Sequence, residues 1–582
     1  MKMESNGGQS FFDFNDNNIR PAADVDVRKR IYLCPRKILW QTEEDGAQVE
    51  NSGALLLDRS VQISLEATNP CILRNNGKKA GVLLDFGVEI HGGIIISAWK
   101  ENKGAGTKVR VRFGESAMEA MSDIGDDKNA TNDHANRDII TNISSMSMTP
   151  VGETGFRFVR LDLMEEQAEL VLKTVKAVLI IKDVPYRGSF QSSDELLNRI
   201  WYTGAYTVHL NMQDYIWDGI KRDRLVWVGD MHPEITTIQA VFGSDQSITR
   251  SLEFVKAETP LPGWMNGYPA YSMWWILILH DYFLHTNDLE YLKSNREYLL
   301  GLSDQLSASI DENGKDTTPQ IRFLDWPSHA DTVVVDAGLQ ALHTIAAQKL
   351  KRIFQILGEK EHELRCGEDL MRLKKYPADY KESKQAAALL VMAGLLDANT
   401  ANEKLLKAGG AKGMSTFMGY YILTARAMAG DLTGCLDCVR DYWGGMLRLG
   451  ATTFWEDFDV EWMEHAAPID SLLHSPKEVD IHGTFGRYCY KGYRHSLCHG
   501  WASGVTPWLT ENVLGLKVLE PGCRLIGAEP KLGDLKWVKG SFPTPCGEVC
   551  IQARQDEDGT IHASVSAPDE VEIRKMPGIC WE

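Results

Sequence analysis

The sequence predicts a multidomain protein in which a long helical region lies between two β-rich regions. Short β-branched segments, partly alternating, extend to about residue 185, and helical spacing of the hydrophobic residues then lasts to about residue 514. Strand-like segments return after that point. The chain has 582 residues, 43% of them hydrophobic, which is enough to bury a large core. The predicted parts are a flexible polar tail (1–30), an N-terminal β-sandwich (31–185), a helical domain (186–514) and a small C-terminal β-domain (515–582).

The first β-rich region carries its strand signals in segments that Gly, Asn and Lys clusters separate. Residues 80–100, 107–116, 155–163 and 169–181 are rich in β-branched side chains, a pattern typical of an antiparallel sandwich. The polar stretch 118–142 contains Asn and acidic residues throughout, so we interpret it as a loop.

The helical region opens with a capping box. Ser192 and Glu195 stand three residues apart, ahead of an apolar run that falls on one helical face. No strand signal interrupts the region, which disfavours parallel α/β folds. Residues 450–495 are poorly periodic and rich in Trp, His, Asp and Gly, and a loop of that length is usually functional. The other predicted helical segments are 233–258, 270–286, 290–309, 335–357, 381–396, 413–429 and 434–447.

The charge balance narrows the classes of partner. A net charge of −18, from 62 basic and 80 acidic side chains, repels phosphate backbones and anionic lipid. We therefore expect no nucleic-acid partner and no membrane partner, and a monomer or homodimer. The N-terminal residues contain no apolar signal-peptide core, which favours a cytoplasmic location. A signal removed before this chain begins is the alternative.

The cysteines give no sign of a metal site. Of the 11 cysteines, Cys435 and Cys438 form a CxxC pair, and Cys546 and Cys550 a CxxxC pair. Neither pair has a second half at zinc-finger spacing, so buried, reduced thiols are the simpler interpretation. We predict no metal and no cofactor.

The most informative segment is DGIKRDRLVWVGD, residues 218–230. Cleavage of a glycosidic bond requires a protonated carboxyl, and crowding by other carboxylates raises a carboxyl's pKa. Arginines among the carboxylates orient them and bind sugar hydroxyls. A charged surface loop is the alternative, because structural ion-pair networks have similar sequences. The segment interleaves aspartates, basic residues and a tryptophan: Asp218, Lys221, Arg222, Asp223, Arg224, Trp227 and Asp230.

A second segment, GATTFWEDFDVEW, spans residues 450–462. Glu456 follows Trp455, and a carboxylate beside tryptophans in a long loop is a candidate general base. Asp457 and Asp459 compete for that role, and a solvated loop residue is the alternative for Glu456.

A third segment, HSLCHGWASG, spans residues 495–504. His499 lies among small residues and a tryptophan, where its ring nitrogens could bond sugar hydroxyls. A structural histidine is the alternative. Residues 268–275 and 322–328 are candidate stacking platforms, because each contains aromatic side chains.

These three segments together resemble glycoside hydrolase family 78, the α-L-rhamnosidases. The segment GATTFWE resembles the family's second signature, which carries the general base, and SLCHGWASG resembles the third, which ends in a substrate-binding His. The resemblance covers roughly residues 80–570 and implies a central all-α (α/α)6 toroid flanked by an N-terminal β-sandwich and a small C-terminal β-sandwich. The first signature matches at Asp218, Gly219, Arg222, Asp223, Arg224, Trp227, Gly229 and Asp230.

The resemblance also implies a reaction. It assigns Asp223 as general acid and Glu456 as general base in the inverting hydrolysis of a terminal α-L-rhamnosyl bond. Many family members have Glu where this chain has Asp223, so the shorter acid must reach the glycosidic oxygen from a shifted backbone or in a tighter pocket. The expected substrate-binding residues are Asp218, Arg222, Trp227, Asp230, Tyr271, Trp326, Trp455 and His499.

Two alternative functions remain open at this point. One is another glycan-cleaving enzyme on the same scaffold, with a different sugar or as a lyase at a rhamnose–uronate bond. The other is a carbohydrate-binding protein without catalysis. Candidates for both acid and base disfavour the second, and a screen on aryl glycosides would separate the three.

Overall fold

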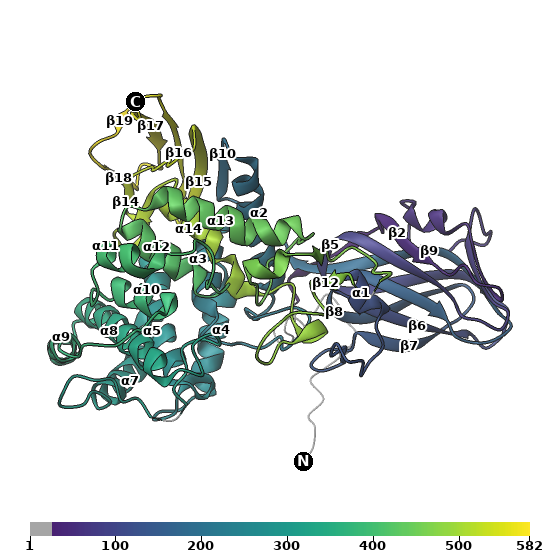
Figure 1. Ribbon diagram of the computed structural model, residues 1–582, viewed down its shortest axis with the longest axis horizontal. Helices are drawn as coiled ribbons and strands as arrows, with labels where there is room; N and C mark the ends of the chain where they lie inside the picture. The colour runs from purple at the N-terminus through teal and green to yellow at the C-terminus, as the bar shows by residue number, and fades with distance from the viewer. Residues whose placement is uncertain (1–25, 320, 476) are drawn as a thin grey trace, which may run out of the picture.

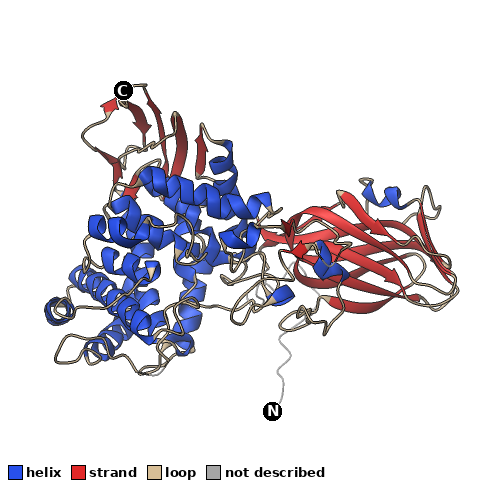
Figure 2. Cartoon of the chain, in the orientation of Figure 1, coloured by secondary structure: helices blue, strands red, loops and turns tan. Residues whose placement is uncertain are grey.

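The computed structural model describes residues 26–319, 321–475 and 477–582. A β-domain from the N-terminal part of the chain packs against one side of a helical domain, and two small sheets pack against another side (Figure 1). The helices are concentrated in the middle of the chain, as the sequence predicts (Figure 2).

The N-terminal domain is a nine-stranded sheet whose paired strands are all antiparallel. The order is β3-β4-β9-β5-β8-β6-β7, with β1 on β9 and β2 on β5. Hydrophobic side chains of its long strands form a core, to which the helical domain adds Leu210, Ile220 and Cys498. The strands are β1 (Arg28–Leu33), β2 (Lys37–Gln41), β3 (Ala47–Glu50), β4 (Cys71–Asn75), β5 (Ala80–Glu101), β6 (Thr107–Gly114), β7 (Asp138–Ile143), β8 (Ser147–Leu163) and β9 (Ala168–Lys182).

Two predictions for this region need correction. The stretch 118–142 is not all loop, because α1 (Ala117–Met121) begins it and β7 ends it by pairing with β6. The predicted tail 1–30 lies mostly outside the described residues, and its last residues belong to β1, which pairs with β9 along its whole length. Both corrections have one cause: pairing with a neighbouring strand orders short polar segments whose own sequence gives a weak strand signal.

The helical domain is a closed ring of helix contacts. In the order α3, α5, α8, α10, α12 and α14, each helix packs against the next, and α14 packs against α3. Helix α5, one of the six helices of the ring, is buried on nearly all sides. The longer helices are α2 (Glu195–Asn211), α3 (Met231–Val241), α4 (Gln246–Ala257), α5 (Pro269–Thr286), α7 (Arg296–Ser307), α8 (Thr332–Leu357), α9 (Lys360–Leu373), α10 (Lys384–Met392), α12 (Gly419–Met428), α13 (Leu432–Arg448) and α14 (Val505–Asn512). The shorter ones are α6 (Leu289–Ser294) and α11 (Ala398–Ala401).

Some helix boundaries differ from the predictions. The predicted helix 233–258 is two helices, because the chain turns at Gly243, whose φ is +95°. Helix α2 is capped by Asp194, whose carboxylate accepts from the backbone N–H of Leu196 at 2.9 Å, so the expected Ser192–Glu195 capping box does not form the cap. The structure also contains α9, which was not among the predicted segments.

The C-terminal part forms two sheets. One has the order β10-β15-β16-β17-β19 and the other β13-β14-β18. Strand β10 precedes the helices in the chain and yet pairs with β15, so the predicted boundary at residue 186 places one strand of this sheet in the wrong domain. The strands are β10 (Ser189–Ser192), β13 (Leu516–Val518), β14 (Leu525–Ala528), β15 (Trp537–Thr544), β16 (Gly547–Gln555), β17 (Ile561–Ser566), β18 (Glu572–Lys575) and β19 (Cys580–Trp581).

The cysteines are unpaired, and most of them are buried, as expected. Cys546, Cys550 and Cys580 are exceptions, because they are exposed on the C-terminal sheet. Within the described residues, no helix has the length and apolar character needed to span a bilayer.

Candidate functional site

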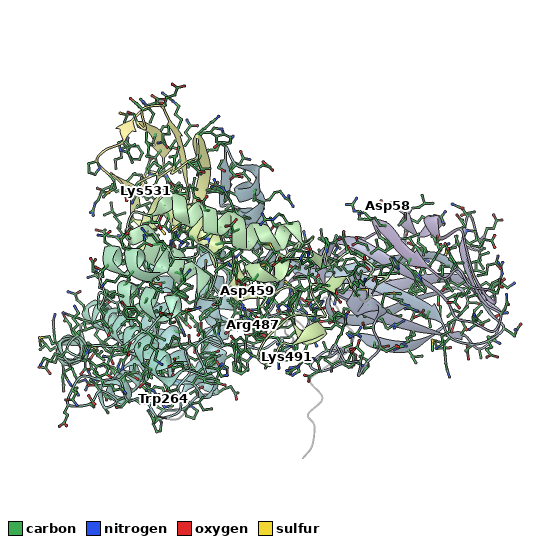
Figure 3. All side chains as sticks on the ribbon, viewed as in Figure 1. Asp58, Trp264, Asp459, Arg487, Lys491 and Lys531 are labelled. Atoms are coloured by element: carbon green, nitrogen blue, oxygen red, sulfur yellow. The ribbon has the colours of Figure 1, made fainter. Side chains whose placement is uncertain are left out.

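Backbone hydrogen bonds bring the three sequence motifs together. Gly219 and His499 form an isolated antiparallel bridge, and the N–H of Gly500 donates to the carbonyl of Asp218 at 2.8 Å. The N–H of Glu456 donates to the carbonyl of Ser496 at 2.9 Å. Segments more than 200 residues apart in the sequence therefore form one wall at the end of the helical ring. The wall contacts the N-terminal domain, since the N–H of Leu497 donates to Glu115 at 2.6 Å. Figure 3 labels Asp459, Arg487 and Lys491 in the part of the molecule between the helices and the N-terminal sheet.

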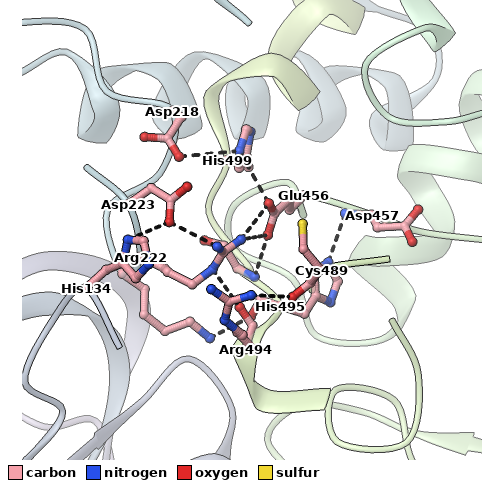
Figure 4. A network of polar contacts seen from close by, with 12 residues as sticks. His134, Asp218, Arg222, Asp223, Glu456, Asp457, Cys489, Arg494, His495 and His499 are labelled. Atoms are coloured by element: carbon pink, nitrogen blue, oxygen red, sulfur yellow. Dashed lines mark hydrogen bonds and ion pairs between the residues drawn. The ribbon is translucent and has the colours of Figure 1, made fainter. Parts of the chain in front are cut away.

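Arg222 links the two predicted catalytic carboxyls. Its Nη2 donates to both oxygens of Glu456, at 2.9 and 3.2 Å, and its Nη1 donates to Oδ1 of Asp223 at 3.0 Å (Figure 4). The backbone N–H of Ser496 gives Glu456 a further hydrogen bond at 3.1 Å. Asp223 and Glu456, 233 positions apart in the sequence, thus contact the same guanidinium.

His499 lies among three carboxyls. Its Nε2 is 3.9 Å from Asp218, 3.9 Å from Asp230 and 3.8 Å from Glu456. These distances exceed a direct hydrogen bond, so a small polar group could sit between the ring and the carboxyls. Burial lowers the pKa of His499 to about 3, so its imidazole is neutral near pH 7. Neutral His499 can both donate and accept hydrogen bonds.

The other two carboxyls are held differently from Glu456. Burial, and then the charge of neighbouring carboxylates, raises the pKa of Asp218 and of Asp230 well above the ordinary value. Asp218 accepts one hydrogen bond from the N–H of Leu225 at 2.9 Å, and Asp230 stands at the N-terminus of α3. Both can therefore keep a proton and donate it in a hydrogen bond. Of the three carboxyls, Glu456 is the one that a guanidinium contacts directly.

An aromatic cavity opens next to these groups. Of the predicted sugar-binding residues, Asp230, Tyr271 and Trp326 line it together with Glu456. The candidate acid Asp223 does not line the cavity, and neither do Asp218, Arg222, Trp227 and His499. Arg222 bonds Glu456, and Nε2 of His499 lies 3.8 Å from it. Trp227 packs edge-on against Tyr271, with ring centroids 6.2 Å apart. Its aromatic walls are Tyr271, Phe323, Trp326, Phe417, Tyr490 and Trp501, and its carboxyls are Asp230, Asp325, Glu456 and Asp457.

One predicted contact needs correction. Trp455 does not line the cavity: it is 1% exposed and packs in the core against Phe458, with ring centroids 5.7 Å apart. Trp501 lines the cavity where Trp455 was expected. The indole N–H of Trp501 donates to the carbonyl of Glu456 at 3.0 Å. Trp455 and Glu456 are adjacent in the sequence, but the ring of Trp455 packs into the core while the carboxyl of Glu456 faces the cavity.

The competing candidates for the base differ in their contacts. Asp459 caps a short helix and pairs with Arg487 at 3.1 Å. Asp457 lines the cavity, and burial raises its pKa to about 6. Glu456 alone among the three shares a guanidinium with Asp223.

Sequence reasoning missed several residues of the site. Asp325 is buried in the cavity wall, and burial raises its pKa to about 6. It lies within the segment 322–328, which was predicted as a stacking platform because of its aromatic side chains. Tyr490 lies in the long loop without a local signal. His134 comes from the N-terminal domain, and its Nδ1 is 2.8 Å from Oδ1 of Asp223.

Lys221, from the first motif, joins the helical domain to the N-terminal domain. Its amino group lies 2.9 Å from Glu115 and 3.4 Å from Glu119, and it donates to the carbonyl of Tyr493 at 2.9 Å. Glu115, Glu119 and His482 are close enough to hold a metal ion. The ammonium of Lys221 already supplies a positive charge to the two carboxylates, so this group fits an internal ion-pair network.

A family model decides which proteins this chain is related to. Residues 185–513 match the model described as the bacterial alpha-L-rhamnosidase 6 hairpin glycosidase domain. The chain belongs to glycoside hydrolase family 78. The match covers more than half of the chain and includes all three motifs, so the family predicted from them is confirmed. No curated protein sequence matches the chain.

Solved rhamnosidase structures of this family share the fold. The GH78 rhamnosidase of Bacillus sp. GL1 aligns with a TM-score of 0.73 and 21% identity over 91% of this chain and 56% of its own. The α-L-rhamnosidase of Dictyoglomus thermophilum aligns with 0.67 and 18%, over 88% and 59%. A rhamnosidase of Klebsiella oxytoca, solved with rhamnose bound, aligns with 0.61 and 16%, over 83% and 96%. The chain thus spans less than two thirds of the first two relatives and nearly all of the third.

Proposed function

We propose that this protein is an inverting α-L-rhamnosidase that hydrolyses terminal α-L-rhamnosyl bonds. The observation that carries the proposal is the single guanidinium of Arg222, which bonds both Asp223 and Glu456 beside an aromatic cavity. Membership in family 78 supports it, and so does the closed ring of six helices, which would be one of the two rings of an (α/α)6 toroid. The two β-regions would then be the flanking sandwiches.

The two carboxyls divide the reaction between them. Asp223 gives its proton to the departing oxygen, and Glu456 takes a proton from a water that attacks the opposite face of the anomeric carbon. Arg222 bonds both carboxyls, so one guanidinium keeps them close to each other. In an inverting site the two carboxyls stand about 6.5–9.5 Å apart, which leaves room for the attacking water. Asp223 is 17% exposed, so a leaving group can reach it from solvent.

The remaining groups suit a neutral sugar. Protonated Asp218 and Asp230 can donate to hydroxyls, and neutral His499 can donate or accept. Tyr271, Trp326 and the other aromatic walls offer flat faces to the C–H side of a sugar ring. L-Rhamnose carries no charge and has an apolar methyl group, which matches a cavity of this kind.

The test uses an aryl α-L-rhamnoside. We expect the wild-type protein to release the aryl group and free rhamnose, with the β-anomer formed first, as proton NMR of the fresh product would detect. Glu456→Gln and Asp223→Asn should each lower kcat by about 100-fold or more while substrate binding is retained. An α-anomeric first product would indicate retention, and near-normal turnover of Glu456→Gln would remove that residue from the base role.

Two controls separate this function from the alternatives. A lyase would yield an unsaturated product that absorbs in the near ultraviolet, whereas a hydrolase would not. A protein that binds rhamnose and cleaves none of the aryl glycosides of L-rhamnose, L-mannose or a uronic acid would be a binding protein.

A further inference from the structure

One side chain of the N-terminal domain reaches the candidate acid directly. Nδ1 of His134 lies 2.8 Å from Oδ1 of Asp223, the same oxygen that accepts from Arg222 (Figure 4). Both His134 and Asp223 have left-handed backbone, with φ of 67° and 60°. Such backbone is unusual for residues other than glycine and fixes the direction of each side chain.

The loop that carries His134 is anchored to the rest of the site. The Asp133 carboxylate accepts from Arg494 at 2.6 and 2.9 Å, and the carbonyl of Arg494 accepts from Nε of Arg222 at 3.0 Å. The carbonyl of Lys128 accepts from the N–H of Tyr493 at 2.8 Å. The same loop thus contacts the acid through His134 and the linking guanidinium through Arg494.

The proposed reaction leaves Asp223 without a proton after each turnover. The proton of Asp223 departs with the alcohol, while the proton of the attacking water goes to Glu456. Before the next turnover Glu456 must release one proton to solvent and Asp223 must take one up. Arg222, which is permanently charged, can hold the Asp223 carboxylate in place and cannot supply that proton.

We propose that His134 is a positioning residue that holds the Asp223 carboxyl and returns its proton. The inference rests on the proposed function. The His134 side chain is 33% exposed, so its ring can take a proton from a hydronium ion at Nε2 and donate the proton on Nδ1 to Asp223. The neutral ring that remains exchanges its proton with solvent, so that Nδ1 carries a proton again before the next turnover. Its Nε2 lies 3.2 Å from Asp133, which keeps the ring oriented.

The charged groups around His134 come from several segments. Asp133 and Asp223 are the acidic groups in contact with its ring. The guanidinium of Arg224 donates to the carbonyl of His134 at 3.4 Å. Arg222 bonds Asp223 and Arg494 bonds Asp133, so these two arginines contact the acids and not His134. The two acids thus contact the ring nitrogens themselves, whereas the arginines contact neighbouring atoms.

The experiment compares His134→Gly with a matched control, His465→Gly. His465 also has left-handed backbone, with φ of 65°, but its side chain is 84% exposed and its neighbour is Glu464. Glycine suits that backbone at both positions. Each variant is assayed on two rhamnosides: an alkyl one, whose leaving group needs a proton, and a dinitrophenyl one, whose leaving group does not.

We expect His134→Gly to lower kcat on the alkyl rhamnoside by about 10-fold to 100-fold and on the dinitrophenyl one by less than about twofold, with little change in KM. Added imidazole should restore much of the lost rate, since the position is open to solvent. His465→Gly should match wild type on both substrates. Asparagine also tolerates left-handed backbone. If the glycine variant fails to fold, His134→Asn should show the same loss of rate.

The outcomes distinguish the two proposals. Wild-type protein that cleaves neither rhamnoside overturns the proposed function. Active wild type, together with a His134 variant that loses rate equally on both substrates and does not respond to imidazole, overturns this inference alone.

Discussion

Replacement of Arg222 by methionine would test how much one buried guanidinium stabilises the site. The Arg222 and Glu456 side chains are 7% and 5% exposed, and they are joined by hydrogen bonds of 2.9 and 3.2 Å. Methionine keeps much of the volume of the arginine stem and removes the charge and all four hydrogen bonds, including those to Asp223 and to the carbonyl of Arg494. The variant leaves the Glu456 carboxylate buried without its cation.

The expected loss of stability follows from the burial of the Arg222–Glu456 pair. Removing one partner of a buried ion pair destabilises a protein by about 3 to 5 kcal/mol. If residues 185–513 unfold as one unit, an unfolding entropy of about 2.1 cal/mol/K per residue converts that loss to a Tm about 4 to 7 °C lower. Differential scanning calorimetry at pH 7 would measure it.

Arg224→Met is the matched control. Arg224 lies two residues after Arg222 and is only partly buried. It donates to backbone carbonyls at 3.3 and 3.4 Å. Its replacement should cost less than about 1 kcal/mol. If Arg222→Met and this control have the same Tm, the reasoning is refuted. The bonds of Arg222 to Glu456 and Asp223 would then contribute no measurable stability.

Two further predictions concern pH and steric fit. Burial lowers the pKa of His91 from 6.5 to about 3. Between these pH values the unfolded chain therefore binds one more proton than the folded chain. The stability that neutral His91 contributes is present above pH 6.5 and is lost as the pH falls toward 3. His91→Phe should reduce the slope of unfolding free energy against pH in that window by about 1.4 kcal/mol per unit, and an unchanged slope, as expected for exposed His465→Phe, would contradict this. Separately, a Cβ on Gly229 would lie 2.2 Å from the ring of Tyr271, so Gly229→Ala should displace that ring and lower kcat/KM on an aryl rhamnoside by about tenfold or more. Gly53→Ala, where a Cβ meets nothing within 4 Å, should leave kcat/KM unchanged, and equal rates in the two variants would show that Tyr271 does not shape the site.

The candidate acid and base, Asp223 and Glu456, could be proposed from the sequence because their signals are local. Asp223 and Glu456 each lie in a short segment whose charged, aromatic and glycine residues stand at fixed spacing. The direction of a single ring was not predictable in the same way. Trp455 and Trp501 both lie in the predicted motifs, and only tertiary packing decides that the first enters the core and the second faces the cavity.

Contacts between domains account for most of what the sequence did not predict. His134 lies in a polar stretch that we interpreted as loop, and its relation to Asp223 depends on how two domains dock. Strand β10 likewise has four residues and a weak signal, and it exists as a strand because β15 pairs with it. The helices of the ring were easier to predict, because each has an apolar pattern of its own, although Gly243 divides one of them.

The contact of Lys221 with Glu115 and Glu119 has a consequence for how such proteins can change over evolutionary time. A recombination event near residue 185 would separate a buried ammonium from the carboxylates that balance it, and each fragment would inherit an uncompensated charge. The two regions must therefore be inherited together, or exchanged only with donors that carry the same ionic pairing.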